Sequence, residues 1–126
     1  MSMRSPLGRV RGLGSAREGV GHWWAQRMTS LALVPLALWF VAALVTLTGA
    51  DHATARDWIA APVPASLLVL LIVATFYHGA LGLQVIVEDY VHHEGAKLAA
   101  LIAVNGLSLV LGLTGVMAVL TVLFGG

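Results

Sequence analysis

Apolar residues gather in three long segments of this chain, and two short polar connectors separate them. We expect these segments to form helices over about residues 29–48, 63–88 and 98–124. Each segment reaches or exceeds the length of about 20 residues that a helix needs to cross the hydrocarbon of a bilayer. The pattern therefore predicts an all-α integral membrane protein with three transmembrane helices.

Prolines mark one bend and one helix start in this pattern. Pro35 lies inside the first segment, where we expect a bend rather than a break because neighbouring groups in a membrane protein can satisfy the freed carbonyl. Pro62 and Pro64 stand at the start of the second segment and suit the first turn of a helix. The two connectors, residues 49–58 and 88–97, are polar.

The composition agrees with a membrane protein. Of the 126 residues, 59% are hydrophobic and 10% are charged, and the mean hydropathy is +0.89. A soluble domain carries about 25% charged residues, so this chain lacks the polar surface to cover itself in water. The absence of cysteine excludes disulfides and thiolate-bound iron–sulfur clusters within the chain. The net charge of +1 gives no reason to expect nucleic acid as a partner.

The placement of the basic residues predicts the orientation in the membrane. Residues 1–28 carry five arginines against one acid, and Lys97 lies in the second connector. Basic residues near the ends of spans favour the cytoplasmic side. We therefore expect a basic cytoplasmic segment over 1–28 and a three-helix anchor domain over 29–126, in a bacterial plasma membrane or, in a eukaryote, the mitochondrial inner membrane. An arginine-rich transit peptide is an alternative for the first dozen residues.

Three smaller features have structural interpretations. Residues 15–18 have the form of a capping box, which could start a short helix. Trp23 and Trp24 precede the first span and suit the headgroup layer, where amphipathic rings lie, although they could also border a partner or a ligand. Small residues in the third span allow close helix packing. These small residues are Gly106, Ser108, Gly112 and Gly115.

His78 is the only ionisable residue well inside any of the three segments. Such a residue is costly at membrane depth, so it suggests a function by default. It could ligate haem iron, relay protons or hydrogen-bond across helices. Gly79 and Gly82 carry no side-chain bulk beside it, which favours a flat macrocycle on this face. No other histidine lies at membrane depth, so a bis-histidine haem would take its second ligand from another polypeptide.

Asp89 and Tyr90 lie at the end of the segment that holds His78. Asp89 follows His78 by eleven positions, which places the two about 20° apart around a helix and roughly 16 Å apart along it. An acid and an aromatic residue are common at a membrane interface. They could also bind a quinone, with the phenol donating to a carbonyl oxygen and the carboxylate orienting the ring or relaying protons. We interpret His92 and His93 as solvated connector residues.

The motif of His78, ten intervening residues and Asp89-Tyr90 resembles the family of hydrophobic membrane anchors of succinate dehydrogenase, complex II. Further stretches resemble the alphaproteobacterial and mitochondrial-type branch of that family. These stretches are residues 12–16, 22–27 and 84–92. The resemblance covers almost the whole chain, in order, and implies the three spans of that family, which pack with a second anchor protein in a helical bundle.

The resemblance implies a role for each residue of the motif. His78 would be one axial ligand of haem b, and the other would come from the second anchor protein of the complex, a cytochrome b556-type polypeptide. Tyr90 would donate a hydrogen bond to ubiquinone, and Asp89 would support that site. Arg27 resembles an arginine near the haem propionates, and Gly82 would leave space for the haem.

The implied function is that of an anchor in succinate:ubiquinone oxidoreductase, an enzyme of the respiratory chain and the tricarboxylic acid cycle. Electrons would arrive from the iron–sulfur protein of the complex, after succinate oxidation at FAD in the flavoprotein. The chain would not be an enzyme alone.

Three other functions stay open. The same scaffold working in reverse would be the anchor of a quinol:fumarate reductase. A haem-free proton-relay or transporter accessory protein would use His78 and Asp89, and it would show no Soret absorption. In a purely structural anchor, replacing His78 by alanine would leave quinone reduction unchanged.

Overall fold

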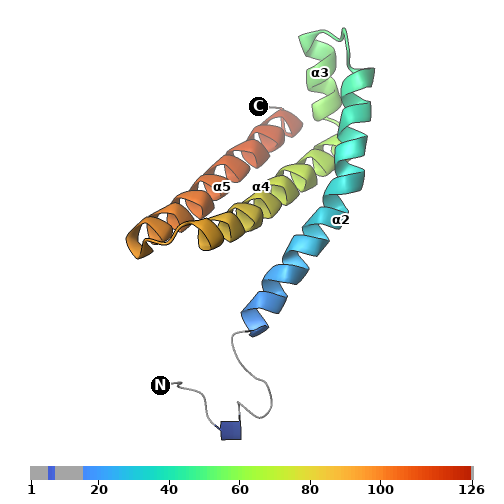
Figure 1. Ribbon diagram of the computed structural model, residues 1–126. Coiled ribbons are helices and arrows are strands. Elements are labelled where there is room, and N and C mark those ends of the chain that lie inside the picture. The colour runs from blue at the N-terminus through green and yellow to red at the C-terminus, as the bar shows by residue number, and fades with distance from the viewer. Residues whose placement is uncertain (1–5, 8–15, 126) are drawn as a thin grey trace.

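The computed structural model describes residues 6–7 and 16–125, and within this part the chain is helical apart from turns and connectors (Figure 1). In chain order the helices are α2 (Ala16–Thr46), α3 (His52–Ile59), α4 (Pro62–Tyr90) and α5 (Glu94–Leu123). Three of them, α2, α4 and α5, are long and apolar enough to cross a membrane. The prediction of an all-α chain with three candidate spans is confirmed.

The long helices extend beyond the predicted spans at their polar ends. The boundary expected between residues 28 and 29 lies inside α2, which continues unbroken through Pro35. The polar connector expected over residues 88–97 is wrong in its bounds, because only residues 91–93 separate α4 from α5. Glutamate and lysine are good helix formers, so a change in polarity does not end a helix. The predicted short helix after residues 15–18 is instead the start of α2, and Ser15 lies outside the described residues.

The first connector contains a helix that the polar pattern did not predict. Asp51 caps α3 by accepting a hydrogen bond from the Thr54 amide at 2.8 Å, as aspartate commonly does at a helix N-terminus. The turn before it uses Gly49, whose φ of +83° lies in the left-handed region that glycine adopts without strain. Trp58 of α3 stacks on Trp39 of α2, with ring centroids 5.7 Å apart. The short helix is therefore held against the end of a span.

The cap on α3 depends on the ionised carboxylate of Asp51. Hydrogen bonds from the side chain and then the backbone amide of Thr54 hold the pKa of Asp51 below its ordinary value of 3.8. Because the folded-state pKa is lowered, this contribution to stability is present above the ordinary pKa and is lost as the pH falls through the lowered one. The cap is accordingly intact at neutral pH.

The helix α4 lies between α2 and α5 and packs against both, whereas α2 and α5 do not meet within the described residues (Figure 1). The three spans form an open row with α4 in the centre. A small core lies near α3, with Ala65, Leu68 and Val119 buried at its centre. Many large apolar side chains of the three spans are exposed. Apolar surface of this extent suits lipid or another membrane protein rather than water.

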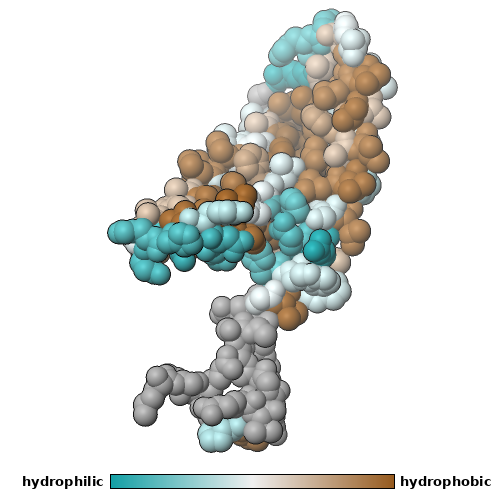
Figure 2. Space-filling model, viewed as in Figure 1, coloured by the Kyte–Doolittle hydropathy of each residue, from teal (hydrophilic) through white to brown (hydrophobic). Residues whose placement is uncertain are grey.

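Hydrophilic residues gather at the two ends of this row. Figure 2 shows teal surface over the junction of α4 with α5 and over α3, with brown surface on the helices between them. An apolar band between two polar ends is the pattern that a bilayer requires of a spanning protein. The fold therefore places the C-terminal end of α4 and the N-terminal end of α5 at one membrane surface, and α3 at the other.

Glycines let α5 approach α4 closely, as predicted, at two of the expected positions. A Cβ added at Gly115 would lie 3.2 Å from Ile72 Cγ2, and one added at Gly112 would lie 3.5 Å from Phe76 Cβ. At Gly106 the same atom would meet nothing within 4 Å. Gly106 therefore does not pack against α4, and close packing of this residue on a helix of another protein stays a prediction.

We expect Gly115→Ala to destabilise the protein, because the added methyl group would crowd Ile72. Overpacking of this kind costs about 1–3 kcal/mol, which exceeds the gain of about 0.5–1 kcal/mol from replacing glycine within a helix. The measurement is the midpoint of thermal unfolding of the protein purified in detergent. Gly106→Ala is the matched control and should not lower that midpoint. Equal midpoints for the two variants would contradict the packing argument.

Candidate functional site

The central polar contact of the three spans joins α2 to α4. His78 is half-buried in α4, and its Nδ1 lies 3.0 Å from Oγ1 of Thr29 in α2. The Thr29 hydroxyl also lies 2.7 Å from the carbonyl oxygen of Ala25 and 3.1 Å from that of Gln26. The predicted intramembrane histidine is therefore packed against a neighbouring span, with one of its two ring nitrogens engaged.

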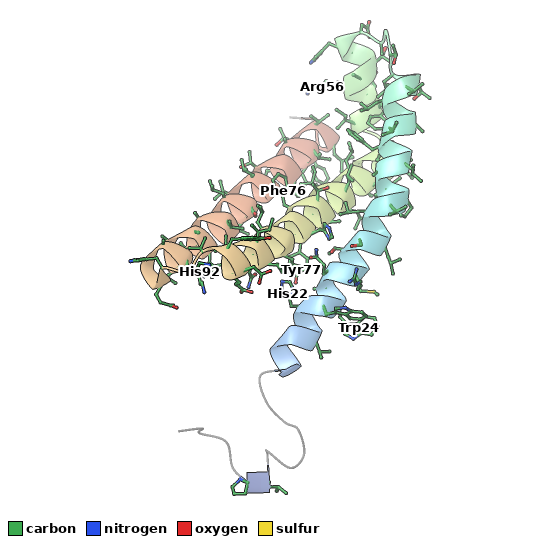
Figure 3. The ribbon with its side chains drawn as sticks, in the orientation of Figure 1. His22, Trp24, Arg56, Phe76, Tyr77 and His92 are labelled. Atoms are coloured by element: carbon green, nitrogen blue, oxygen red, sulfur yellow. The ribbon has the colours of Figure 1, made fainter. Side chains whose placement is uncertain are left out.

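Polar side chains continue from this contact along α2 toward its N-terminal end. The Nε2 atom of His22 and the Oε1 atom of Gln26 are buried and have no hydrogen-bond partner among the described residues. His22, Gln26 and Thr29 follow a helical spacing of four and three residues and so share one face of α2. Figure 3 shows His22 on the side of α2 that faces α4, and Trp24 on the opposite side. We call these four residues, His22, Gln26, Thr29 and His78, the polar seam.

The predicted open face at Gly82 borders the polar seam. A Cβ built at Gly82 would lie 3.9 Å from Nε2 of Gln26, which is ordinary van der Waals contact, whereas one at Gly79 would meet nothing within 4 Å. Gly82 therefore brings the amide of Gln26 close to the backbone of α4. The unfilled space lies beside Gly79, immediately after His78.

Arg27 occupies a different face of α2 from the residues that contact α4. Its guanidinium carbon lies 5.4 Å from the ring centroid of Trp23, at a distance typical of cation–π contacts. Trp23 and Trp24 form an edge-to-face pair with centroids 5.2 Å apart, and both rings are about half exposed. This arrangement suits the predicted position of the tryptophans in a headgroup layer.

Asp89 and Tyr90 form the last two positions of α4, in the helix rather than in a connector. Both are exposed, and 76% of the surface of Tyr90 is accessible. Among the described residues neither side chain makes a hydrogen bond, although Gln84 Nε2 donates to Glu88 Oε1 at 3.2 Å one turn earlier. The pair is thus free to contact a ligand or a partner at this membrane surface.

The connector histidines are exposed, as predicted. His92 lies between the helices, and His93 is the N-cap of α5, where its Nδ1 accepts a hydrogen bond from the Ala96 amide at 3.1 Å. The interpretation of both as solvated connector residues is confirmed, and His93 has a capping role in addition.

A cavity of about 440 Å³ lies between α4 and α5, away from the α2 side of α4. Its walls are mostly apolar, but Tyr77, Asn105 and Ser108 contribute polar groups. Figure 3 shows Phe76 on the side of α4 that faces α5, in agreement with its contact to Gly112. The cavity and the polar seam therefore occupy different faces of the central helix.

The structure brings His78 together with residues that the sequence interpretation had assigned to the head or left without a role. Thr29, Gln26 and His22 were not predicted as site residues, and Arg27, Asp89 and Tyr90 do not contact His78. One signal was available, since polar residues at helical spacing before and inside an apolar span are costly unless they face a partner. That signal does not say which helix they face.

Comparison with known proteins gives a consistent result. Residues 1–115 match the model of the family described as succinate dehydrogenase/fumarate reductase transmembrane subunit. The chain is 28% identical over 102 residues to the succinate dehydrogenase hydrophobic membrane anchor subunit of Rickettsia bellii, covering 81% of this chain and 82% of that protein. It is 29% identical over 98 residues to the protein of the same name from Paracoccus denitrificans, covering 78% and 75%.

No solved structure gives a significant match to the chain. The family match is nevertheless extensive, because it begins at the first residue and includes α2, α4 and the greater part of α5. On this match, the chain belongs to the family of succinate dehydrogenase/fumarate reductase transmembrane subunits.

Proposed function

We propose that this chain is the membrane anchor of a succinate:ubiquinone oxidoreductase, in which it ligates haem b and forms part of the ubiquinone-reducing site. The relatives, which are named as succinate dehydrogenase anchors, support the direction of the reaction. The observation that carries the haem assignment is His78, a half-buried histidine in the middle of a span with one ring nitrogen engaged by Thr29.

The residues around His78 fit a haem iron. With Nδ1 hydrogen-bonded to Thr29, the Nε2 atom is left for ligation. The space beside Gly79 is open, and the polar seam holds two buried polar atoms that still lack partners. When bound, haem b would supply a one-electron redox centre in the complex. The chain's own part is to bind this group and orient it through the ring of His78.

The second axial ligand would come from a partner protein. His22 lies seven residues before Thr29, about 10 Å nearer the N-terminal end of α2, in the basic segment that precedes the first predicted span. The other histidines lie at the start of α3 or in the connector before α5. The cytochrome b556-type anchor of the same complex is the proposed source, and the open row of helices leaves apolar surface on which it could pack.

Tyr90 and Asp89 would form this chain's share of the ubiquinone site. The phenol can donate a hydrogen bond to a quinone carbonyl, and the carboxylate can orient the head group or accept a proton. Their exposure at the end of α4 agrees with a site completed by other polypeptides. We propose the iron–sulfur protein and the cytochrome b556-type anchor for that role, with the flavoprotein earlier on the electron path.

Two further assignments belong to this proposal. Arg27 would contact a haem propionate through the N–H groups of its guanidinium, which lies over the ring of Trp23. The N-terminal segment would lie in the cytoplasm, since five arginines precede the first span and Lys97 lies near the start of the third. Succinate oxidised on that side would then deliver electrons to the surface that holds Tyr90.

The test of this function is to purify the complex through a tag on this chain and to record a reduced-minus-oxidised visible spectrum beside the rate of succinate-dependent ubiquinone reduction. We expect a b-type α-band and a quinone-reducing activity in the same preparation. A complex without haem would contradict the ligation by His78. A preparation that reduces fumarate with quinol faster than it oxidises succinate would instead identify a fumarate reductase anchor.

A further inference from the structure

We propose that Thr29 is a positioning residue that holds His78 in the tautomer with its proton on Nδ1. This leaves the lone pair of Nε2 available to a metal. The inference deepens the proposed haem ligation and rests on it. Its basis is the contact of 3.0 Å between Thr29 Oγ1 and His78 Nδ1 across two spans.

The direction of this hydrogen bond follows from counting protons on the Thr29 hydroxyl. A hydroxyl carries one proton, and a carbonyl oxygen can only accept. The hydroxyl lies 2.7 Å from the Ala25 carbonyl oxygen, so its proton is engaged within α2. Toward His78 the hydroxyl oxygen can then only accept. The proton in the contact must belong to Nδ1 of His78.

The opposite arrangement is less favourable. If the hydroxyl donated to Nδ1, the proton of a neutral imidazole would sit on Nε2, for which the described residues offer no acceptor. A polar hydrogen left without a partner away from water costs about 1–3 kcal/mol. The short contact with Ala25 would be given up as well. Among the described residues, Nε2 of His22 is a buried atom without a hydrogen-bond partner. Nε2 of His78 is not such a buried atom, so a group from outside the chain can reach it.

The bond has two consequences for a ligated metal. It fixes the plane of the imidazole, and it makes the ring more basic because the Nδ1 proton is partly shared with an acceptor. Thr29 can do this because its own rotamer is held by the bond to α2. Ser30, the adjacent hydroxyl, donates instead to the Gln26 carbonyl at 2.7 Å and does not bond to His78. Ser30 is therefore a matched control.

The test compares Thr29→Val, Thr29→Ser and Ser30→Ala with the wild type in the purified complex, by redox titration of the haem and electron paramagnetic resonance of its ferric form. We expect Thr29→Val to raise the haem reduction potential, because a less basic imidazole stabilises ferric iron less. The low-spin ferric signal should shift, and haem affinity should fall by about 10- to 100-fold, as for other outer-shell partners of metal ligands. Thr29→Ser should restore the wild-type values, and Ser30→Ala should not change them.

Other outcomes separate this inference from the proposed function. If His78→Ala removes the haem but Thr29→Val keeps the wild-type potential and signal, the role of Thr29 is overturned and the ligation stands. If the wild type lacks haem, or His78→Ala keeps it unchanged, both fall. Should Thr29→Val lose the haem entirely, Thr29→Ser decides: wild-type values support the role of the hydroxyl, and the same loss overturns it, because serine keeps that hydroxyl.

Discussion

Replacement of His78 by alanine is expected to abolish the b-type α-band of the complex, or to reduce haem occupancy at least tenfold. Axial ligation through an imidazole nitrogen is what this side chain would supply. Of the histidines that the structure describes, His78 alone lies inside one of the predicted spans, and His22 lies in the basic segment before the first of them. The measurement is the reduced-minus-oxidised spectrum, normalised to protein.

The substitution should leave the fold of the spans intact. The Thr29 hydroxyl keeps its bond to the Ala25 carbonyl when the imidazole is removed, so no buried donor loses its partner. His92→Ala is the matched control, since His92 is exposed in the connector between α4 and α5. An unchanged α-band in the His78→Ala variant would contradict the assignment of His78 as a haem ligand.

The same experiment also decides between the alternative functions. A wild-type complex without Soret absorption would favour a proton-relay protein that uses His78 and Asp89 without haem. Loss of the haem with quinone reduction unchanged would place the haem off the required electron path. Loss of both in a complex that stays assembled would support a place for the haem on that path.

Tyr90→Phe is expected to lower kcat/KM for ubiquinone by about 10- to 100-fold while succinate oxidation by a water-soluble electron acceptor stays at the wild-type rate. The substitution removes one hydrogen-bond donor and keeps the ring. Leaving a quinone carbonyl unpaired in a closed site costs about 1–3 kcal/mol, and each 1.4 kcal/mol corresponds to a factor of about ten. The soluble acceptor reports on the electron path before the membrane, which this residue does not touch.

The chain offers a matched control for this variant in Tyr77, its only other tyrosine. Tyr77 also lies in α4 and is 51% exposed, but it lines the cavity against α5 rather than the end of the helix. Tyr77→Phe should keep the wild-type rate with ubiquinone. Equal losses in the two variants would point to a general disturbance of α4, and no loss in Tyr90→Phe would remove the phenol from the quinone site.

Much of the fold could be predicted from the order of residues alone. The three spans, the continuity of α2 through Pro35 and the exposure of His92 and His93 are confirmed. The exact helix ends and α3 were missed. Both depend on specific contacts, such as the cap by Asp51 and the stacking of Trp58 on Trp39. The pattern of polar and apolar residues does not reveal such contacts.

The candidate site was predictable only in part. His78 stood out because an ionisable residue in an apolar run is rare, and Asp89-Tyr90 because of its spacing from His78. Thr29 gave no comparable signal, since a threonine near the start of a span can satisfy its hydroxyl within its own helix. The roles of His78, Asp89, Tyr90 and Arg27 stay predictions until the variants are measured.

The sequence by itself determined that this chain has three spans and that a histidine lies inside the second of them. The free energy of placing a helix in hydrocarbon is close to a sum over its residues, so the hydropathy of the sequence is enough to locate the spans. Only the tertiary structure decided that Thr29 meets Nδ1 of His78, and that Gly112 and Gly115 face α4 while Gly106 does not. Those contacts depend on how packed helices are rotated and offset against one another, which is set by the fit of whole surfaces and not by any local pattern.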